Sequence, residues 1–355
     1  MKIGILTLPF NNNYGGLLQS YALQSFLKQR GHDVWLIKRI PNKPNLIRKI
    51  KDLIKKILLE LPVIDFNMKS FESQYMQETE IINSSNKYKL LDKYNFDAYV
   101  VGSDQVWRFA YTQERTKEYF FDFVPDKNAK KIAFSASFGI DTWEADKNTT
   151  EEISKLICNF AAVSVREKSG VDLCRKCFGY NNAIQLLDPT LLYSADFYRQ
   201  LYTGIETDNG GKIGVYFLGK NEQKMELALG FAKQTGKSLF TIGKRKAGIK
   251  YYYPTVSQWI KDFDTVDYII TDSFHGMVFS IIFRKPFCVI KNKNRGLGRM
   301  VFLLEEFGLQ DKLINIKEKI NYDALLLKVN YNLVEDRLNF NRKLSEKFLS
   351  DMNLF

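Results

Sequence analysis

The stretch KIGILTLPFNNNYGGLLQSYALQSFLKQRGHDVWLIK, residues 2–38, decides the fold. It begins with Lys2–Leu8, a short apolar run typical of a buried strand. A glycine-containing turn at Asn13–Gly16 leads into leucine and tyrosine residues at helical spacing, and Gly31 ends that helix. Asp33–Lys38 is the next short apolar run. This order of strand, helix and strand predicts two parallel strands joined by a right-handed crossover.

The same alternation continues along the chain. Further strands are predicted at Asp97–Val101, Lys131–Ser135, Ala162–Val165, Ala183–Leu187, Ile213–Leu218, Ser238–Ile242, Tyr268–Thr271 and Pro286–Ile290. Helices are predicted between the later strands at Asn221–Gln234, Val256–Phe263 and His275–Arg284. The pattern is interrupted by a polar patch at Glu206–Gly211 and then restarts. We therefore predict an α/β protein made of two Rossmann-like domains that face a cleft.

The predicted domain boundaries follow this division. The first domain covers residues 1–195 and includes an insertion at 42–90, the second covers 196–320, and a helical C-terminal segment covers 321–355. In folds of this kind a terminal helix often packs back on the first domain, and we carry that as an expectation.

Composition supports a folded protein with an anionic partner. The 355 residues are 45% hydrophobic and 14% aromatic, which excludes disordered and low-complexity classes. The net charge is 52 − 40 = +12, which suits a nucleic acid, a phosphorylated metabolite or an acidic membrane surface. No nucleic-acid-binding module is present, so we expect no nucleic acid partner. The absence of a signal peptide or a spanning segment, together with only four cysteines, predicts a cytoplasmic protein.

The insertion contains a basic amphipathic segment. Residues 45–61, NLIRKIKDLIKKILLEL, place leucine and isoleucine on one face of a helix and lysine and arginine on the rest. Such a helix either lies on an anionic membrane surface or packs on its own domain with solvated lysines. The first alternative predicts peripheral attachment to the inner face of the cell membrane.

Several common motifs are absent or fail on context. No G-x-G-x-x-G follows a strand, so a dinucleotide site has no support. Cys174 and Cys177 form a single C-x-x-C, and a zinc site needs about four ligands. The acidic pair in Asp262-Phe263-Asp264 resembles a D-x-D metal motif but is more simply a surface loop. We therefore predict no metal and no cofactor.

The most informative residue is His275, in Thr271-Asp-Ser-Phe-His-Gly276. It follows a predicted strand and starts a helix, at the edge of a parallel sheet where ligands usually bind. A helix N-terminus attracts a phosphate or carboxylate, and a histidine there can exchange a proton with it. The alternative is a capping and packing cluster in which Ser273 is the N-cap.

Other candidates also follow strands. Gly102 and Ser103 precede Asp104, an acid able to act on a hydroxyl group. Arg166 either grips a carboxylate or phosphate or forms an ion pair with Glu167 or Asp188. The remaining candidates are Asn13, Tyr14, Gly15 and Gly16 in the first turn, and Arg295 and Arg299 near the start of a later helix.

Six motifs in fixed order carry a resemblance to a known family. They are NYGGLLQSYAL (13–23), VVGSDQVW (100–107), IAFSASFG (132–139), VSVRE (163–167), LLDPTLLY (186–193) and ITDSFHGMVFSIIFRKPF (270–287). Together they resemble the polysaccharide pyruvyl transferase family, from residue 3 to about residue 310. No motif falls in residues 42–90 or in the C-terminal helix.

The resemblance implies a glycosyltransferase-B-like fold, no metal, and phosphoenolpyruvate as a co-substrate. Members attach pyruvate as a ketal across two hydroxyls of a sugar in a bacterial capsule or exopolysaccharide. The acceptor implied is a sugar on an undecaprenyl diphosphate carrier. The alternative on the same fold is a glycosyltransferase that uses a nucleotide sugar.

The family motifs map onto particular residues of this chain. The histidine of the S-x-H-G motif is His275, the arginine of the S-V-R-E motif is Arg166, and the loop arginine is Arg299 or Arg295. The resemblance thus implies His275 and Asp104 as catalytic groups and the other candidates as substrate-binding groups. Some distant members have an arginine where this chain has Ser273, so part of the donor's charge must be met elsewhere.

Overall fold

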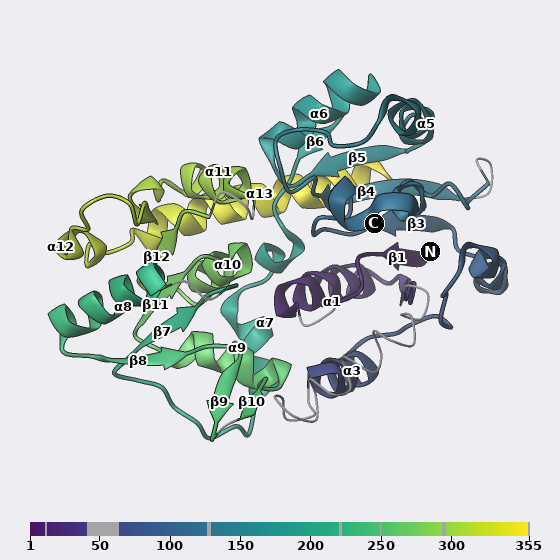
Figure 1. Ribbon diagram of the computed structural model, residues 1–355. Coiled ribbons are helices and arrows are strands. Elements are labelled where there is room, and N and C mark those ends of the chain that lie inside the picture. The colour runs from purple at the N-terminus through teal and green to yellow at the C-terminus, as the bar shows by residue number, and fades with distance from the viewer. Residues whose placement is uncertain are drawn as a thin grey trace. The chain divides into compact units, whose positions relative to one another are not determined.

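The computed structural model describes residues 1–10, 13–40, 64–125, 129–219, 222–248, 250–292 and 296–353. The chain divides into two compact units (Figure 1). Unit 1 contains the described parts of Met1–Lys49, Ser70–Leu192 and Phe340–Phe355, and unit 2 those of Ile50–Lys69 and Tyr193–Asn339. The amphipathic segment predicted at 45–61 lies outside the described residues.

Unit 1 is built on a six-stranded parallel sheet with the order β2-β1-β3-β4-β5-β6. Its strands are β1 (Lys2–Leu6), β2 (Asp33–Leu36), β3 (Ala98–Val101), β4 (Lys130–Ala136), β5 (Ala162–Val165) and β6 (Ile184–Gln185). The main helices between them are α1 (Tyr14–Lys28), α4 (Phe109–Thr112), α5 (Lys147–Ile157) and α6 (Lys168–Phe178). Shorter 3-10 turns are η1 (Ser85–Tyr94), η2 (Gln113–Phe120) and η3 (Pro189–Leu192). Helix α3 (Ile64–Tyr75) precedes η1.

Unit 2 has a five-stranded parallel sheet with the order β13-β12-β11-β7-β8. Its strands are β7 (Lys212–Tyr216), β8 (Ser238–Thr241), β11 (Tyr268–Thr271), β12 (Phe287–Ile290) and β13 (Leu313–Ile314). A separate antiparallel hairpin joins β9 (Arg245–Ala247) to β10 (Lys250–Tyr252). The helices are α7 (Ala195–Arg199), α8 (Glu222–Thr235), α9 (Val256–Thr265), α10 (Phe274–Ile282), α11 (Leu297–Phe307) and α12 (Tyr322–Leu325), with 3-10 turns η4 (Gln200–Tyr202) and η6 (Gln310–Lys312).

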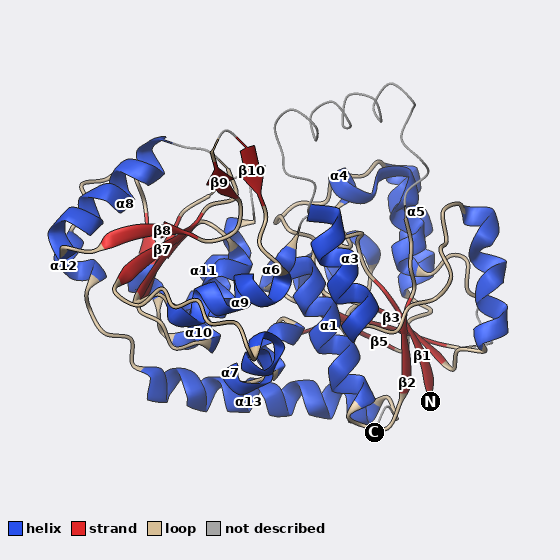
Figure 2. Cartoon of the chain, turned by 90° about the horizontal axis from the view of Figure 1, so that it is seen from below, coloured by secondary structure: helices blue, strands red, loops and turns tan. Residues whose placement is uncertain are grey.

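Each unit is a Rossmann-like α/β fold, as the alternating sequence pattern predicts (Figure 2). The central strands read as unbroken apolar runs because helices cover both faces of a parallel sheet. All four residues of β3, β5, β11 and β12 are buried. The hairpin β9–β10 and the two-residue strand β13 are not among the predicted strands, since each is too short to show a period.

Aromatic packing fills the core beside each sheet. In unit 1 the Trp107 ring stacks on Phe120 at 4.8 Å, and the Trp107 indole N–H donates to the Tyr119 carbonyl at 3.0 Å. In unit 2 Phe231 packs on Tyr268 at 4.5 Å. Both tryptophan polarity and ring area are therefore satisfied inside the fold.

The C-terminal segment differs from the single long helix predicted from Tyr322. It contains α12 and then α13 (Tyr331–Asp351), because Asn321 caps the first helix and Asn330 accepts a hydrogen bond from Leu333 N at the start of the second. Residues of α13 up to Asn339 belong to unit 2, and those from Phe340 belong to unit 1.

Specific contacts tie each part of α13 to its unit. The Tyr331 hydroxyl donates to the Lys285 carbonyl at 2.6 Å in unit 2. In unit 1, Arg342 Nε donates to the Leu191 carbonyl at 2.9 Å, and the Phe348 ring lies 6.1 Å from that of Phe134. Among the described residues, no helix is both long enough and apolar enough to cross a bilayer.

Two carboxylates share one lysine beside β2. Lys38 Nζ lies 3.4 Å from Glu72 Oε2 and also forms an ion pair with Glu78. Burial raises the pKa of Glu72 to about 7, and the neighbouring Glu78 carboxylate raises it further than Lys38 can lower it.

We expect this cluster to make stability depend on pH. A folded-state pKa above the unfolded value of about 4.3 means that stability from protonated Glu72 is lost as pH rises toward 7. Glu72→Gln removes that titration, so its melting temperature relative to wild type should increase between pH 5 and pH 8. Thermal unfolding followed by circular dichroism measures the difference, and Glu151→Gln, at an exposed site, controls for net charge. A difference that stays constant with pH contradicts the assignment.

Candidate functional site

The strand order of unit 1 reverses between β1 and β3. Strand β1 pairs with β2 on one side and with β3 on the other, so loops leave their carboxyl ends in opposite directions. Ligands of open α/β sheets bind at such a switch point. Three predicted groups lie there: the first turn of α1, Gly102 and Ser103 after β3, and Asp104.

Asn13 links the start of α1 to Asp104. Its side-chain oxygen caps the helix by accepting from Gly16 N at 3.0 Å, and its Nδ2 donates to Asp104 Oδ2 at 3.0 Å. A Cβ on Gly16 would lie 2.6 Å from Asn13 Nδ2, so glycine is required there. Tyr14 and Gly15 are buried in the same turn.

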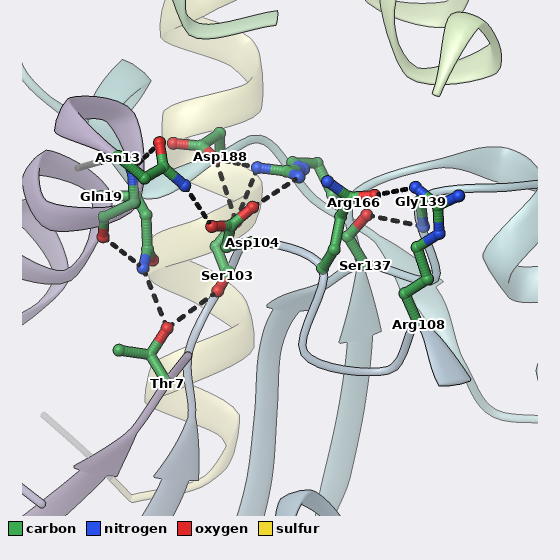
Figure 3. A network of polar contacts seen from close by, with 12 residues as sticks. Thr7, Asn13, Gln19, Ser103, Asp104, Arg108, Ser137, Gly139, Arg166 and Asp188 are labelled. Atoms are coloured by element: carbon green, nitrogen blue, oxygen red, sulfur yellow. Dashed lines mark hydrogen bonds and ion pairs between the residues drawn. The ribbon is translucent and has the colours of Figure 1, made fainter. Parts of the chain in front are cut away.

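Asp104 has a strained backbone. Its φ is +75°, a left-handed conformation that costs energy in a residue with a side chain. Its carbonyl accepts from Ser137 N at 3.0 Å, which holds the turn in place. Strain of this kind concentrates at functional sites, and here it aims a carboxylate toward Asn13 and Arg166 (Figure 3).

Arg166 forms the buried ion pair with Asp188 that was the alternative to a ligand contact. Its guanidinium donates to Asp188 Oδ2 at 2.5 Å and lies 3.8 Å from Asp104 Oδ1. Ser103 Oγ donates to the same Asp188 oxygen at 3.0 Å, and Thr190 donates to the other through its amide and hydroxyl. The side chains converge in Figure 3.

Glu167, the other partner considered for Arg166, is used elsewhere. One of its oxygens accepts from Ser137 Oγ at 3.0 Å, from Phe138 N at 2.6 Å and from Gly139 N at 3.1 Å. It therefore holds the loop that follows β4.

One guanidinium between two carboxylates leaves this site with net negative charge. A bound anion has to compete with Asp104 and Asp188 for Arg166, whereas a hydroxyl group can donate to a carboxylate directly. Gly102 is buried, but a Cβ there would meet its nearest neighbour only at 3.6 Å. Packing within the chain does not require glycine at that position, and its role toward a ligand stays a prediction.

Unit 2 has its own switch point, between β7 and β11. Here the residues after β11 start α10, and Ser273 Oγ caps it by accepting from Gly276 N at 3.3 Å. Thr271 Oγ1 donates to the Tyr216 carbonyl at 2.7 Å, and a Cβ on Gly276 would lie 2.3 Å from Thr271 Oγ1. The turn therefore needs its small residues.

His275 and Arg299 meet the two sides of one aromatic residue. The His275 ring lies edge-on to Phe274 at 5.2 Å, and the Arg299 guanidinium lies 5.3 Å from the centre of the Phe274 ring. His275 is 7% exposed and Arg299 is 5% exposed. Arg299 lies in the first turn of α11 rather than in the loop before it. Arg295 lies outside the described residues.

A buried aspartate precedes the cap of α10. Asp272 Oδ1 accepts from Leu218 N at 2.7 Å, and Oδ2 accepts from Lys224 Nζ at 2.6 Å and from Asn292 Nδ2 at 3.1 Å. Asp272 is fully buried and Lys224 is 8% exposed. The three donors come from the loop after β7, from α8 and from the loop after β12.

Sequence reasoning did not single out these polar partners as site residues. Asp188 and Asp272 each follow a strand, so the rule that selected Asp104 was sufficient to find them. Lys224 has no such signal, because α8 carries several charged residues and spacing does not show which one is buried. The candidates divide between the two switch points, with Asn13, Asp104 and Arg166 together in unit 1.

Comparison with protein families gives one match. A family model described as "Polysaccharide pyruvyl transferase" matches residues 13–294, which is more than half of the chain. The match includes Asn13, Asp104, Arg166 and His275, while Arg295 and Arg299 lie beyond its end. No curated protein sequence matches the chain.

Solved structures with similar folds include three UDP-GlcNAc 2-epimerases. The enzyme from Methanocaldococcus jannaschii, in complex with UDP-GlcNAc and UDP, has a TM-score of 0.52 at 12% identity, with 100% of both chains covered. The Neisseria meningitidis enzyme bound to UDP-GlcNAc has a TM-score of 0.51 at 10% identity, covering 97% of this chain and 94% of its own. The Rickettsia bellii enzyme scores 0.52 at 10% identity, covering 99% and 95%. The likeness establishes a fold of the glycosyltransferase-B type.

The Arg166–Asp188 pair predicts a large loss of stability when one partner is removed. Asp188→Asn should lower the free energy of unfolding by about 3–5 kcal/mol, because a buried guanidinium loses its nearest carboxylate. Urea unfolding measures this. Asp172→Asn, which breaks the exposed pair with Arg175, should cost less than about 1 kcal/mol. Equal losses in the two variants contradict the prediction.

Proposed function

Because the chain belongs to the polysaccharide pyruvyl transferase family, we propose that it transfers the pyruvyl group of phosphoenolpyruvate to two hydroxyls of a sugar, as a ketal. The observation that carries this proposal is the family match across residues 13–294, which contains the switch-point residues of both units. The setting is the synthesis of a bacterial surface polysaccharide such as a capsule or exopolysaccharide.

Unit 2 is the proposed donor side. Phosphoenolpyruvate carries a carboxylate and a phosphate, and the first turn of α10 offers N–H groups with a positive dipole. His275 lies in that turn, and Arg299 adds a guanidinium next to Phe274. Arg295 is assigned to the donor from the sequence alone.

Ketal formation has two additions. A proton goes to the methylene carbon of phosphoenolpyruvate, a sugar oxygen attacks the central carbon, and the C–O bond to phosphate breaks. The second hydroxyl then attacks, and each attacking oxygen gives up its proton, so the products are a cyclic ketal and inorganic phosphate. His275 is the proposed acid, base or phosphate contact, and Asp104 is the carboxylate proposed to stabilise the oxocarbenium-like carbon.

Unit 1 is the proposed acceptor side. Its net negative cluster suits hydroxyl groups better than a second anion, and Asp104 offers a carboxylate oxygen to them. In this proposal Arg166 shares its guanidinium between Asp188 and substrate. The acceptor we propose is a sugar on an undecaprenyl diphosphate carrier, in keeping with the net charge of +12 and the basic segment 45–61.

The reaction is tested by supplying two kinds of donor with a lipid-linked sugar. Release of inorganic phosphate from phosphoenolpyruvate, together with an acceptor that gains pyruvate less one water by mass spectrometry, is the expected result. Release of a nucleoside diphosphate from a nucleotide sugar instead identifies a glycosyltransferase and rejects the proposal.

His275→Ala should lower turnover by about 10²–10⁴-fold, the contribution typical of one general acid–base group. The chain has one other histidine, His32, so His32→Gln is the matched control and should keep wild-type turnover. Phosphate release measures both rates, and circular dichroism checks the fold. A wild-type rate in His275→Ala removes this residue from the mechanism.

The membrane proposal predicts a charge-dependent association. Wild-type protein should sediment with anionic vesicles, and replacement of the lysines and arginines in 45–61 by glutamate should abolish this. Vesicles of neutral lipid are the control. Equal use of a water-soluble sugar that lacks lipid and diphosphate contradicts the lipid-linked acceptor.

A further inference from the structure

The carboxylate of Asp272 lies one residue before the cap of α10, in the turn that leads to His275. It is fully buried and accepts hydrogen bonds from three different segments of unit 2. A negative charge at this place opposes the binding of an anion, because it cancels the positive end of the helix dipole.

Lys224 supplies the opposite charge. Its ammonium group lies 2.6 Å from Asp272 Oδ2, and the two side chains are 10% and 0% exposed. Water screens a pair buried to this degree only weakly, so the two charges act on nearby groups as one neutral unit. Without the lysine, the start of α10 would face a buried carboxylate.

We propose that Lys224 keeps the donor site electropositive by neutralising Asp272, so that the charge of α10 and Arg299 is left for the donor. This inference rests on the proposed function, since the anion in question is phosphoenolpyruvate. Lys224 is a positioning residue here, and it meets part of the demand created by Ser273, which stands where some distant family members have an arginine.

Asn292 completes the arrangement. Its amide donates to the same Asp272 oxygen at 3.1 Å and fixes the loop that follows β12, which leads toward α11 and Arg299. The neutral unit therefore joins the two elements that carry His275 and Arg299. Its geometric and electrostatic roles can be separated because they predict opposite results for one of the two charge removals.

The test is a double-mutant cycle on the full chain, with phosphoenolpyruvate binding measured by calorimetry. Lys224→Met leaves Asp272 unpaired and should weaken affinity at least about tenfold. Asp272→Asn leaves the lysine charge and should bind at least as tightly as wild type. The double variant K224M/D272N restores neutrality and should lie within about threefold of wild type.

A matched pair at the opposite end of β11 serves as control. Lys237 and Asp267 form an ion pair with side chains that are 36% and 38% exposed. Lys237→Met removes the same charge from the same unit and should leave affinity unchanged. Thermal melting of each variant checks its fold, and Asp272→Asn and the double variant keep the test informative if Lys224→Met does not fold.

A purely structural role predicts that all three variants at Lys224 and Asp272 bind more weakly, and that outcome overturns the inference while the proposed function stands. Wild-type protein that does not bind phosphoenolpyruvate overturns both. Tighter or equal binding by Asp272→Asn, with weaker binding by Lys224→Met, supports the inference.

Discussion

A charge buried at the carboxyl edge of a parallel sheet has to be neutralised by a partner, and this constraint organises both units. In unit 1 Asp188 pairs with Arg166, and in unit 2 Asp272 pairs with Lys224. Each pair lies beside a switch point of its sheet, where strand ends and helix starts come together. The loops that carry the candidate residues are therefore held by ion pairs that water cannot reach.

The two pairs leave different net charges around them. In unit 1 a second carboxylate, Asp104, shares the guanidinium of Arg166. In unit 2 the acid is matched by one lysine, and Arg299 lies nearby on Phe274. This difference is the physical basis for assigning a hydroxyl-bearing acceptor to unit 1 and an anionic donor to unit 2.

The fold class follows from the sequence because parallel strands buried on both faces are continuous apolar runs, and β5 and β11 have the predicted bounds. Short elements such as β13 and the hairpin β9–β10 contain too few residues to show a period. At the site, position after a strand was sufficient to select Asp104, Arg166 and His275. Lys224 was not predictable, since only tertiary packing decides which lysine of α8 is buried. The roles of the predicted residues toward substrate stay predictions.

Helix α13 has a consequence for how the protein is made. Its last part, from Phe340, packs on β4 and on the turn at Leu191, yet a ribosome produces it only after all of unit 2. Domains usually fold in the order in which they emerge. Here the earlier half of the polypeptide waits, with the surface around Phe134 uncovered, until synthesis has passed the later half, so the nascent chain has a long interval in which a chaperone can bind that surface.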